Sequence, residues 1–285
     1  MNMATLSATV TPVADEALAR PRGLLHDIGV ITRRGLTHLK RQPEALSDAT
    51  IQPIMFVLLF AYVFGGAIDV PGGGSYREFL MGGIFAQTIV FTAFGVAMSL
   101  AHDRKNQVVD RFRSLPISTG AVLGGHAVTN LVKSMLPIGL MSLCGLAIGW
   151  RVHAGLFHAA LGYGLLVAFA FAMIWVGVVF GSLVATPEGV QGIGFAVLFP
   201  LTFMASTFVP SSTMPKVLRV FAEWNPVTAV ADAVRAQFGN PNTPLQPGDP
   251  WAIRHPLTYS VIWTVAIIVV CAPLAVRIYK RSVAK

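Results

Sequence analysis

Long apolar runs without a charge constrain this chain more than any other feature. A helix needs about 20 apolar residues to cross about 30 Å of hydrocarbon, and six stretches of the sequence meet or nearly meet this length. They cover residues 50–68, 79–101, 120–150, 156–185, 190–209 and 257–276. Unpaired backbone groups are too costly in lipid, so the helix is the default spanning form. We therefore predict an all-α membrane protein with six transmembrane helices.

The composition agrees with a chain that is surrounded mostly by lipid. Only 12% of the residues are charged and 54% are hydrophobic, whereas a soluble domain carries about 25% charged residues. The net charge of +8 invites a nucleic-acid-binding interpretation. However, the basic residues cluster at the ends of the predicted spans, as is typical of membrane proteins. We expect membrane lipid, and no nucleic acid, as a partner.

Lysine and arginine residues set the expected orientation. Fourteen of the 21 precede the first span, lie between the second and third spans, or follow the sixth span. Positive residues favour the cytoplasmic side of a membrane, and an even number of spans places both termini on the same side. We expect a multi-pass protein of the plasma membrane with both termini in the cytoplasm.

Two segments precede the first span. Residues 1–22 are small, polar and broken by proline, without the apolar core of a secretory signal, and we expect a disordered tail. Residues 23–42 predict an amphipathic helix. Its apolar side chains fall on one face, away from most of the basic ones: Leu25, Ile28, Leu36 and Leu39. This pattern favours an interfacial helix on the inner leaflet, with a merely solvated basic helix as the alternative.

Several functional classes lack their motifs in this chain. The dipeptide Gly-Lys does not occur, so there is no phosphate-binding loop, and any ATP would have to bind to another polypeptide. No Cys/His metal spacing is present, and Cys144 and Cys271 are expected to be inert thiols within apolar runs. All thirteen Asp and Glu residues lie outside the predicted spans. A proton-coupled carrier normally needs an intramembrane carboxylate, whereas sodium coupling through backbone carbonyls stays open.

Intramembrane proteolysis is also disfavoured. No His-Glu-x-x-His motif is present. The run Gly73-Gly74-Ser75 has the form of a Gly-x-Ser element, but it falls in the first predicted outer loop, where a turn is the simpler explanation. We therefore expect a chain that is not an enzyme and binds no metal or cofactor itself.

The predicted cytoplasmic loop between the second and third spans has the pattern of a short amphipathic helix. Val108, Val109, Phe112 and Leu115 would form one apolar stripe, and Pro116 would end the helix. A short helix with one apolar face at a cytoplasmic turn is suited to insertion into a groove on a partner protein. An interfacial helix that contacts lipid headgroups is the alternative.

The segment before the sixth span is expected to be helical as well. Asn225 and Pro226 suit the N-cap and the first helical position, and Gly239 is suited to end the helix. Asp232 and Arg235 lie three residues apart and can pair. A shorter helix precedes this one. The pattern predicts a short helical hairpin on the outer side that dips into the outer leaflet, with a simple extracellular flap as the alternative.

These two segments resemble one known family. The run Asp110-Arg-Phe-Arg-Ser-Leu-Pro-Ile-Ser118 is similar to the signature of daunorubicin-resistance-type permeases, within the type-2 ABC transporter family. The stretch from Phe208 through Trp224-Asn-Pro226 to Asp232-Ala-Val-Arg235 resembles the outer hairpin of that family. Span number, orientation and the N-terminal helix agree, so the resemblance covers residues 23–285 as one permease transmembrane domain.

The resemblance implies a permease that works with a separate ATPase. Two permease copies, or this chain and a paralogue, would pair with two ATPase subunits that carry ATP and Mg. The loop helix would be the coupling helix that docks on the ATPase, formed by Arg104, Val108, Val109, Asp110, Arg111, Phe112, Arg113, Leu115 and Pro116. The implied cargo is a hydrophobic drug-like compound or a lipid, exported from the cytoplasm or the inner leaflet.

A passage for such a cargo would combine apolar surface with a few hydroxyl or amide groups. Candidates on the second and fifth spans are Gln87, Phe91, Thr92, Phe203 and Thr207. Ordinary helix packing is the alternative for each of them, because such residues also pack between spans. For the whole chain, an ion-coupled secondary carrier and a non-transporting scaffold are the competing functions.

Overall fold

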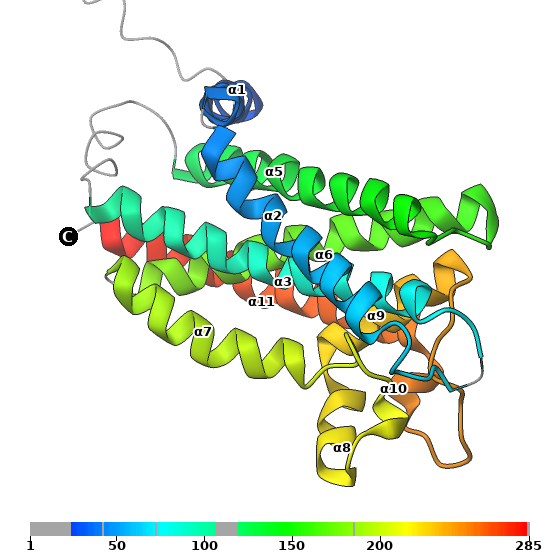
Figure 1. The fold of residues 1–285 in the computed structure, drawn as a ribbon. Coiled ribbons are helices and arrows are strands. Elements are labelled where there is room, and N and C mark those ends of the chain that lie inside the picture. Colours follow the sequence, from blue (N-terminus) through cyan, green and yellow to red (C-terminus); the bar gives the residue numbers. More distant parts are fainter. Residues whose placement is uncertain (1–23, 42, 72, 106–118, 185, 284–285) are drawn as a thin grey trace, which may run out of the picture.

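The computed structural model describes residues 24–41, 43–71, 73–105, 119–184 and 186–283, and every regular element within these ranges is a helix (Figure 1). The expected tail at 1–22 lies outside the described residues, as does the loop at 106–118. Within the described ranges, four helices are long and apolar enough to cross a membrane. They are α3 (Tyr76–Lys105), α5 (Thr119–Ile148), α6 (Gly155–Leu183) and α11 (Pro256–Val283).

The other two predicted stretches fall on shorter helices. α2 (Pro43–Leu59) continues into a π-helical turn, η2 (Phe60–Phe64), and α7 spans Pro187–Phe203. α7 ends before residue 209, where the apolar stretch ends, and residues 204–209 form bends around a turn at 206–207. All six stretches are therefore helical for most of their length, while the number of membrane crossings stays a prediction.

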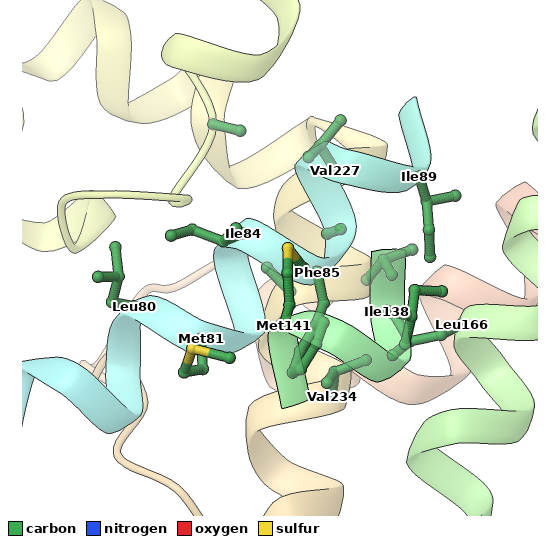
Figure 2. Packing of buried hydrophobic residues seen from close by; sticks show 14 of the residues in the cluster. Leu80, Met81, Ile84, Phe85, Ile89, Ile138, Met141, Leu166, Val227 and Val234 are labelled. Atoms are coloured by element: carbon green, nitrogen blue, oxygen red, sulfur yellow. The ribbon is translucent and has the colours of Figure 1, made fainter. Parts of the chain in front are cut away.

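The core is formed around α3. Side chains from α3, α5, α6 and α9 point toward one another in Figure 2, with Phe85 of α3 between Met141, Leu166 and Val234. α3 and α6 approach closely because small residues line the contact. A Cβ atom at Gly177 would overlap the carbonyl oxygen of Ala93, so only glycine leaves room for the α3 backbone at this point.

α1 (Leu24–Arg41) lies across the bundle. Figure 1 shows it end-on, whereas α3, α5 and α6 run across the view. It packs on the start of α5, where Gly124 faces Ile28 and Gly125 faces Ile31. The predicted helix at 23–42 is confirmed as a helix, and its crossed orientation is the one that an interfacial helix requires.

Short elements gather at one end of the bundle, opposite the end where α3 and α11 have their C-termini (Figure 1). They are η3 (Ser211–Thr213), α8 (Lys216–Trp224), α9 (Pro226–Phe238) and α10 (Trp251–Arg254). Of these, α9 enters the bundle, because most of its residues are buried.

The contact at Gly177 can be tested by overpacking. We expect Gly177→Val to destabilise the chain by about 1–3 kcal/mol, because the added methyl groups force α3 and α6 apart. The measurement is the thermal unfolding midpoint of the purified protein in detergent. Gly164→Val on the same helix is the matched control, since a Cβ atom there meets nothing within 4 Å. Equal midpoints for the two variants would contradict the proposed close contact.

Candidate functional site

A buried arginine joins α3, α9 and the end of α7. Arg235 of α9 is 0% exposed. Its Nε donates to the carbonyl oxygen of Phe79 at 2.7 Å, and its Nη1 donates to Oδ1 of Asp232 at 2.7 Å. Its Nη2 donates to the carbonyl oxygens of Ser206 at 2.7 Å and Thr207 at 3.2 Å. A buried charge is tolerated only when it is paired and hydrogen-bonded, and this guanidinium meets both conditions.

Asp232 supplies the counter-charge within the same helix. Burial raises the pKa of its carboxyl group, and the charge of Arg235 opposes this shift. The 2.7 Å contact between Oδ1 of Asp232 and Nη1 of Arg235 has the geometry of a buried ion pair. The ring of Phe79 closes the other side of the guanidinium, with the ring centre 3.6 Å from Cζ of Arg235, a geometry that favours the cation.

The end of α7 is held by side chains from outside that helix. The last carbonyl groups of a helix have no partner within it. Nδ2 of Asn225 donates to the carbonyl oxygen of Leu201 at 2.7 Å, and the backbone N–H of Ser206 donates to Oγ1 of Thr228 at 2.9 Å. The hydroxyl of Tyr76 donates to the carbonyl oxygen of Phe208 at 3.0 Å. These bonds explain why residues 204–208 leave the helix although they are apolar enough to continue it.

Two adjacent glycines on α3 make room for this arrangement. A Cβ atom at Gly82 would lie 2.5 Å from Cγ of Arg235, and one at Gly83 would overlap the backbone of Thr207. α3 therefore accepts the arginine side chain and the turn after α7 side by side. We refer to Arg235, Asp232, Asn225, Thr228 and Tyr76, with the carbonyl groups that they bind, as the arginine network.

The local sequence of α9 places Arg235 in register. Oδ1 of Asn225 accepts the backbone N–H of Val227 at 2.8 Å, Pro226 is the first helical residue, and Gly239 ends the helix with φ of 69°. The predicted caps and the predicted Asp232–Arg235 pair are confirmed. Because α9 is largely buried, it is not a loose flap at the surface.

Most of the predicted coupling helix lies outside the described residues. This applies to Val108, Val109, Asp110, Arg111, Phe112, Arg113, Leu115 and Pro116. Arg104 is described, and its Nη1 donates to the carbonyl oxygen of Ser182 at 2.9 Å, near the end of α6. The helix and its role therefore stay predictions, while Arg104 is placed where it ties α3 to α6.

Four of the five predicted passage residues lie along one seam between α3 and α7. Gly83 faces Thr207, and the rings of Phe91 and Phe199 are 6.0 Å apart. Gln87 lies between Gly83 and Phe91 on the same face of α3, since residues four apart share a face. Phe203 follows Phe199 by one turn of α7. The fifth residue, Thr92, instead bonds within its own helix, through its hydroxyl to the carbonyl oxygen of Ile89.

The seam holds polar atoms that are buried without a hydrogen-bond partner among the described residues. They are Nε2 of Gln87 and Oγ1 of Thr207, with Oγ of Ser206 beside it in the chain. Buried polar atoms of this kind are rare in native structures and call for an explanation. Because Gln87, Ser206 and Thr207 are themselves buried, these groups lie inside the contact between α3 and the end of α7 and are not open to a ligand in this structure.

A row of phenylalanine rings follows the seam along α7. Neighbouring ring centres lie 5.3 Å apart for Phe195 and Phe199, 5.3 Å for Phe199 and Phe203, and 5.2 Å for Phe203 and Phe208. Phe60 of η2 stacks on Phe208 at 4.2 Å. We call these five residues the phenylalanine row. Only Phe203 of this row is among the passage residues predicted from the sequence, although the spacing of four residues from 195 to 203 is a signal that the sequence contains.

Most of the chain is similar to known transport proteins. The family model described as "ABC-2 type transporter" matches residues 26–238. The daunorubicin resistance ABC transporter permease protein DrrB1 of Streptomyces coeruleorubidus is 29% identical over 250 residues, which cover 87% of this chain and 84% of the relative. The probable doxorubicin resistance ABC transporter permease protein DrrC of Mycobacterium tuberculosis is 23% identical over 253 residues, covering 88% and 87%. The inner membrane transport permease YadH of Escherichia coli K12 is 21% identical over 197 residues, covering 68% and 75%.

The arginine network makes a prediction about its two charges. We expect Arg235→Gln to destabilise the chain by about 3–5 kcal/mol, because it leaves a carboxylate buried without its partner and frees three backbone carbonyls. Asp232→Asn also leaves a buried charge without its partner, but it is expected to cost less than Arg235→Gln, because the guanidinium keeps its bonds to those carbonyls. Thermal unfolding of the purified variants in detergent measures both. A larger loss for Asp232→Asn would show that the carbonyl bonds contribute little.

Proposed function

Because this chain belongs to the ABC-2 type transporter family, we propose that it is the permease subunit of an ATP-driven exporter for a hydrophobic drug-like compound or lipid. The family makes the chain a multi-pass membrane permease and not an enzyme. The observation that carries the proposal is the family match over residues 26–238, together with a sequence that has no nucleotide-binding loop. Energy would therefore come from a separate ABC ATPase subunit.

In the proposed topology the chain crosses the membrane six times, through α2 with η2, α3, α5, α6, α7 and α11. Both termini lie in the cytoplasm. The C-terminal ends of α3 and α11 support this orientation, because they lie together at one end of the bundle (Figure 1) and carry basic residues. α8, at the opposite end of the bundle, supports the same orientation. Its exposed apolar face would contact lipid of the outer leaflet, and consists of Val217, Val220, Phe221 and Trp224.

The proposed coupling runs from the loop after α3 to the arginine network. The helix around residues 103–115 would dock on the ATPase, and ATP binding would move this loop together with α3. Arg235 ties the other end of α3 to α9 and to the turn after α7. A displacement of α3 would therefore move all three as one body, which is the form of rigid-body rocking expected of packed helices.

The proposed passage lies along the phenylalanine row, between two copies of the chain. Phe195, Phe199 and Phe203 are each about two-fifths exposed, at 39%, 39% and 42%. Aromatic faces in a row offer contact for an apolar compound at every depth. Gln87 and Thr207 are buried in this structure and would add polar groups only where α3 and α7 separate. The relatives named for daunorubicin and doxorubicin resistance support a drug-like cargo.

The experiment that tests this function is transport in vesicles. The permease and its ATPase are placed together in inverted membrane vesicles, and uptake of doxorubicin is followed by its fluorescence. We expect uptake that requires both subunits and ATP hydrolysis. Uptake driven by a sodium or proton gradient in vesicles that contain the permease alone would contradict the proposal and favour a secondary carrier.

The coupling helix is tested by Phe112→Asp. We expect this variant to insert into the membrane normally but to lose most of the ATPase that copurifies with it, because the charge removes the apolar anchor of the loop helix. Phe112→Leu, which keeps the apolar contact, is the control and is expected to retain the ATPase. Normal copurification with the aspartate variant would exclude this docking role.

The phenylalanine row is tested by Phe199→Ala. We expect the apparent affinity for doxorubicin to fall about two- to tenfold, which corresponds to about 0.5–1.5 kcal/mol for the loss of one aromatic contact. ATPase association is expected to be unchanged. Phe157→Ala is the control, because Phe157 is exposed on α6 away from the row. An equal effect of both substitutions would mean that the row has no special role in binding.

A further inference from the structure

An open groove lies where α1 crosses the start of α5. Its volume is about 710 Å³. It is lined by apolar, hydroxyl and basic side chains of α1 and by one residue of α5, including Ile28, Gly29, Arg33, Leu36, Thr37 and Val128. Neither the arginine network nor the phenylalanine row includes any of these residues.

The groove follows from the way in which the two helices are packed. Gly124 and Gly125 of α5 bring α1 so close that Ile28 and Ile31 lie on the α5 surface, and Gly35 of α1 lies on Thr129. Because crossed helices touch only at one point, space opens beside the contact. Gly29 lies at this space, and a Cβ atom there would meet nothing within 4 Å.

Arg33 gives the groove a positive charge. Its side chain is exposed, and within the part of the chain that the structure describes it makes no ion pair or side-chain hydrogen bond. The hydroxyl of Thr37 donates to the carbonyl oxygen of Arg33, so this oxygen is occupied while the guanidinium stays available. A guanidinium has the fixed geometry that binds the oxygens of a phosphate group in pairs.

An apolar stripe on α5 continues from the groove. It begins at Val128, which also lines the groove, and its side chains are all more than one-third exposed: Val128, Val132, Leu136, Leu140 and Leu143. The rise of 1.5 Å per residue gives about 22 Å from Val128 to Leu143. Half of the hydrocarbon core of a bilayer is about 15 Å thick. The stripe is therefore long enough to hold one acyl chain of one leaflet along its length.

We propose that the groove and the stripe together bind one anionic phospholipid of the membrane, with its phosphate at Arg33 and an acyl chain along α5. A phospholipid matches this site at both ends. Its phosphate would bind Arg33 in the groove, and its acyl chain would continue along the apolar stripe. This proposal rests on the proposed function only for the orientation of the chain, which places α1 and the start of α5 at the inner leaflet. Such a lipid would hold α1 against α5.

Lipid retention by the purified full-length chain tests this. The protein is placed in nanodiscs that contain phosphatidylglycerol and phosphatidylcholine with the same acyl chains, and the lipids that stay bound after extraction are counted by native mass spectrometry. We expect one phosphatidylglycerol molecule to be retained in preference to phosphatidylcholine. Arg33→Gln is expected to reduce this retention about fivefold, which corresponds to about 1 kcal/mol for one basic residue at a membrane surface.

Filling the groove separates its shape from its charge. Gly29→Phe keeps Arg33 but occupies the space, and we expect it to reduce retention of both lipids. Gly164→Phe, at an exposed glycine of α6 with equal free space, is the control and is expected to retain the lipid. Thermal unfolding checks that each variant is folded.

Three results would overturn the proposal. The first is equal retention of the two lipids by the natural chain. The second is unchanged phosphatidylglycerol retention in both Arg33→Gln and Gly29→Phe. If Gly29→Phe then abolishes a dimer, a second copy of the chain, and not a lipid, occupies the groove. The third is displacement of the lipid by inorganic phosphate alone. Failure of ATP-driven transport with lipid retention intact would count against the proposed function and leave this lipid site standing.

Discussion

The structure depends on one buried charge at the meeting point of three segments. Arg235 is 0% exposed. Its guanidinium donates hydrogen bonds to two backbone carbonyls of the turn after α7, to one carbonyl of α3 and to the carboxylate of Asp232. Removing such a group from water is costly unless every donor finds an acceptor. The segments that supply the acceptors are therefore bound to one position relative to one another.

This constraint explains several features that look unrelated in the sequence. α7 ends at Phe203 because Asn225 and Arg235 take the carbonyl groups of the residues around that end. Two consecutive glycines interrupt the apolar face of α3 because Arg235 and the backbone of Thr207 lie against them. The phenylalanine row is fixed at the same place, since Phe208 stacks on Phe60 directly after the turn. In the proposed exporter, the ATPase would act on the loop after α3, while Arg235 holds the start of α3 to α9 and to the turn after α7.

The sequence predicted the helices and their caps well, because these depend on local chemistry. Asn225, Pro226 and Gly239 specify the ends of α9 through hydrogen bonds and backbone angles within a few residues. The pairing of Asp232 with Arg235 follows from their spacing on one helix turn. The bonds from Arg235 to Phe79, Ser206 and Thr207 join residues 28 to 156 positions apart, and no local pattern indicates such partners. For the same reason the end of α7 was not predicted, since its apolar residues by themselves favour a longer helix. The groove beside α1 depends on how two helices cross, which their separate sequences do not specify.

The most direct test of the central claim is a distance measurement during the ATP cycle. Spin labels are placed at the exposed residues Ser75, which precedes α3, and Ala236 on α9, and their separation is measured by double electron–electron resonance in the complex with the ATPase. If Arg235 joins these segments into one body, the distance distribution is narrow and is the same with and without ATP. A shift of several ångströms on ATP binding, or two populations that interconvert with nucleotide, would show that α3 and α9 move apart and would contradict the account.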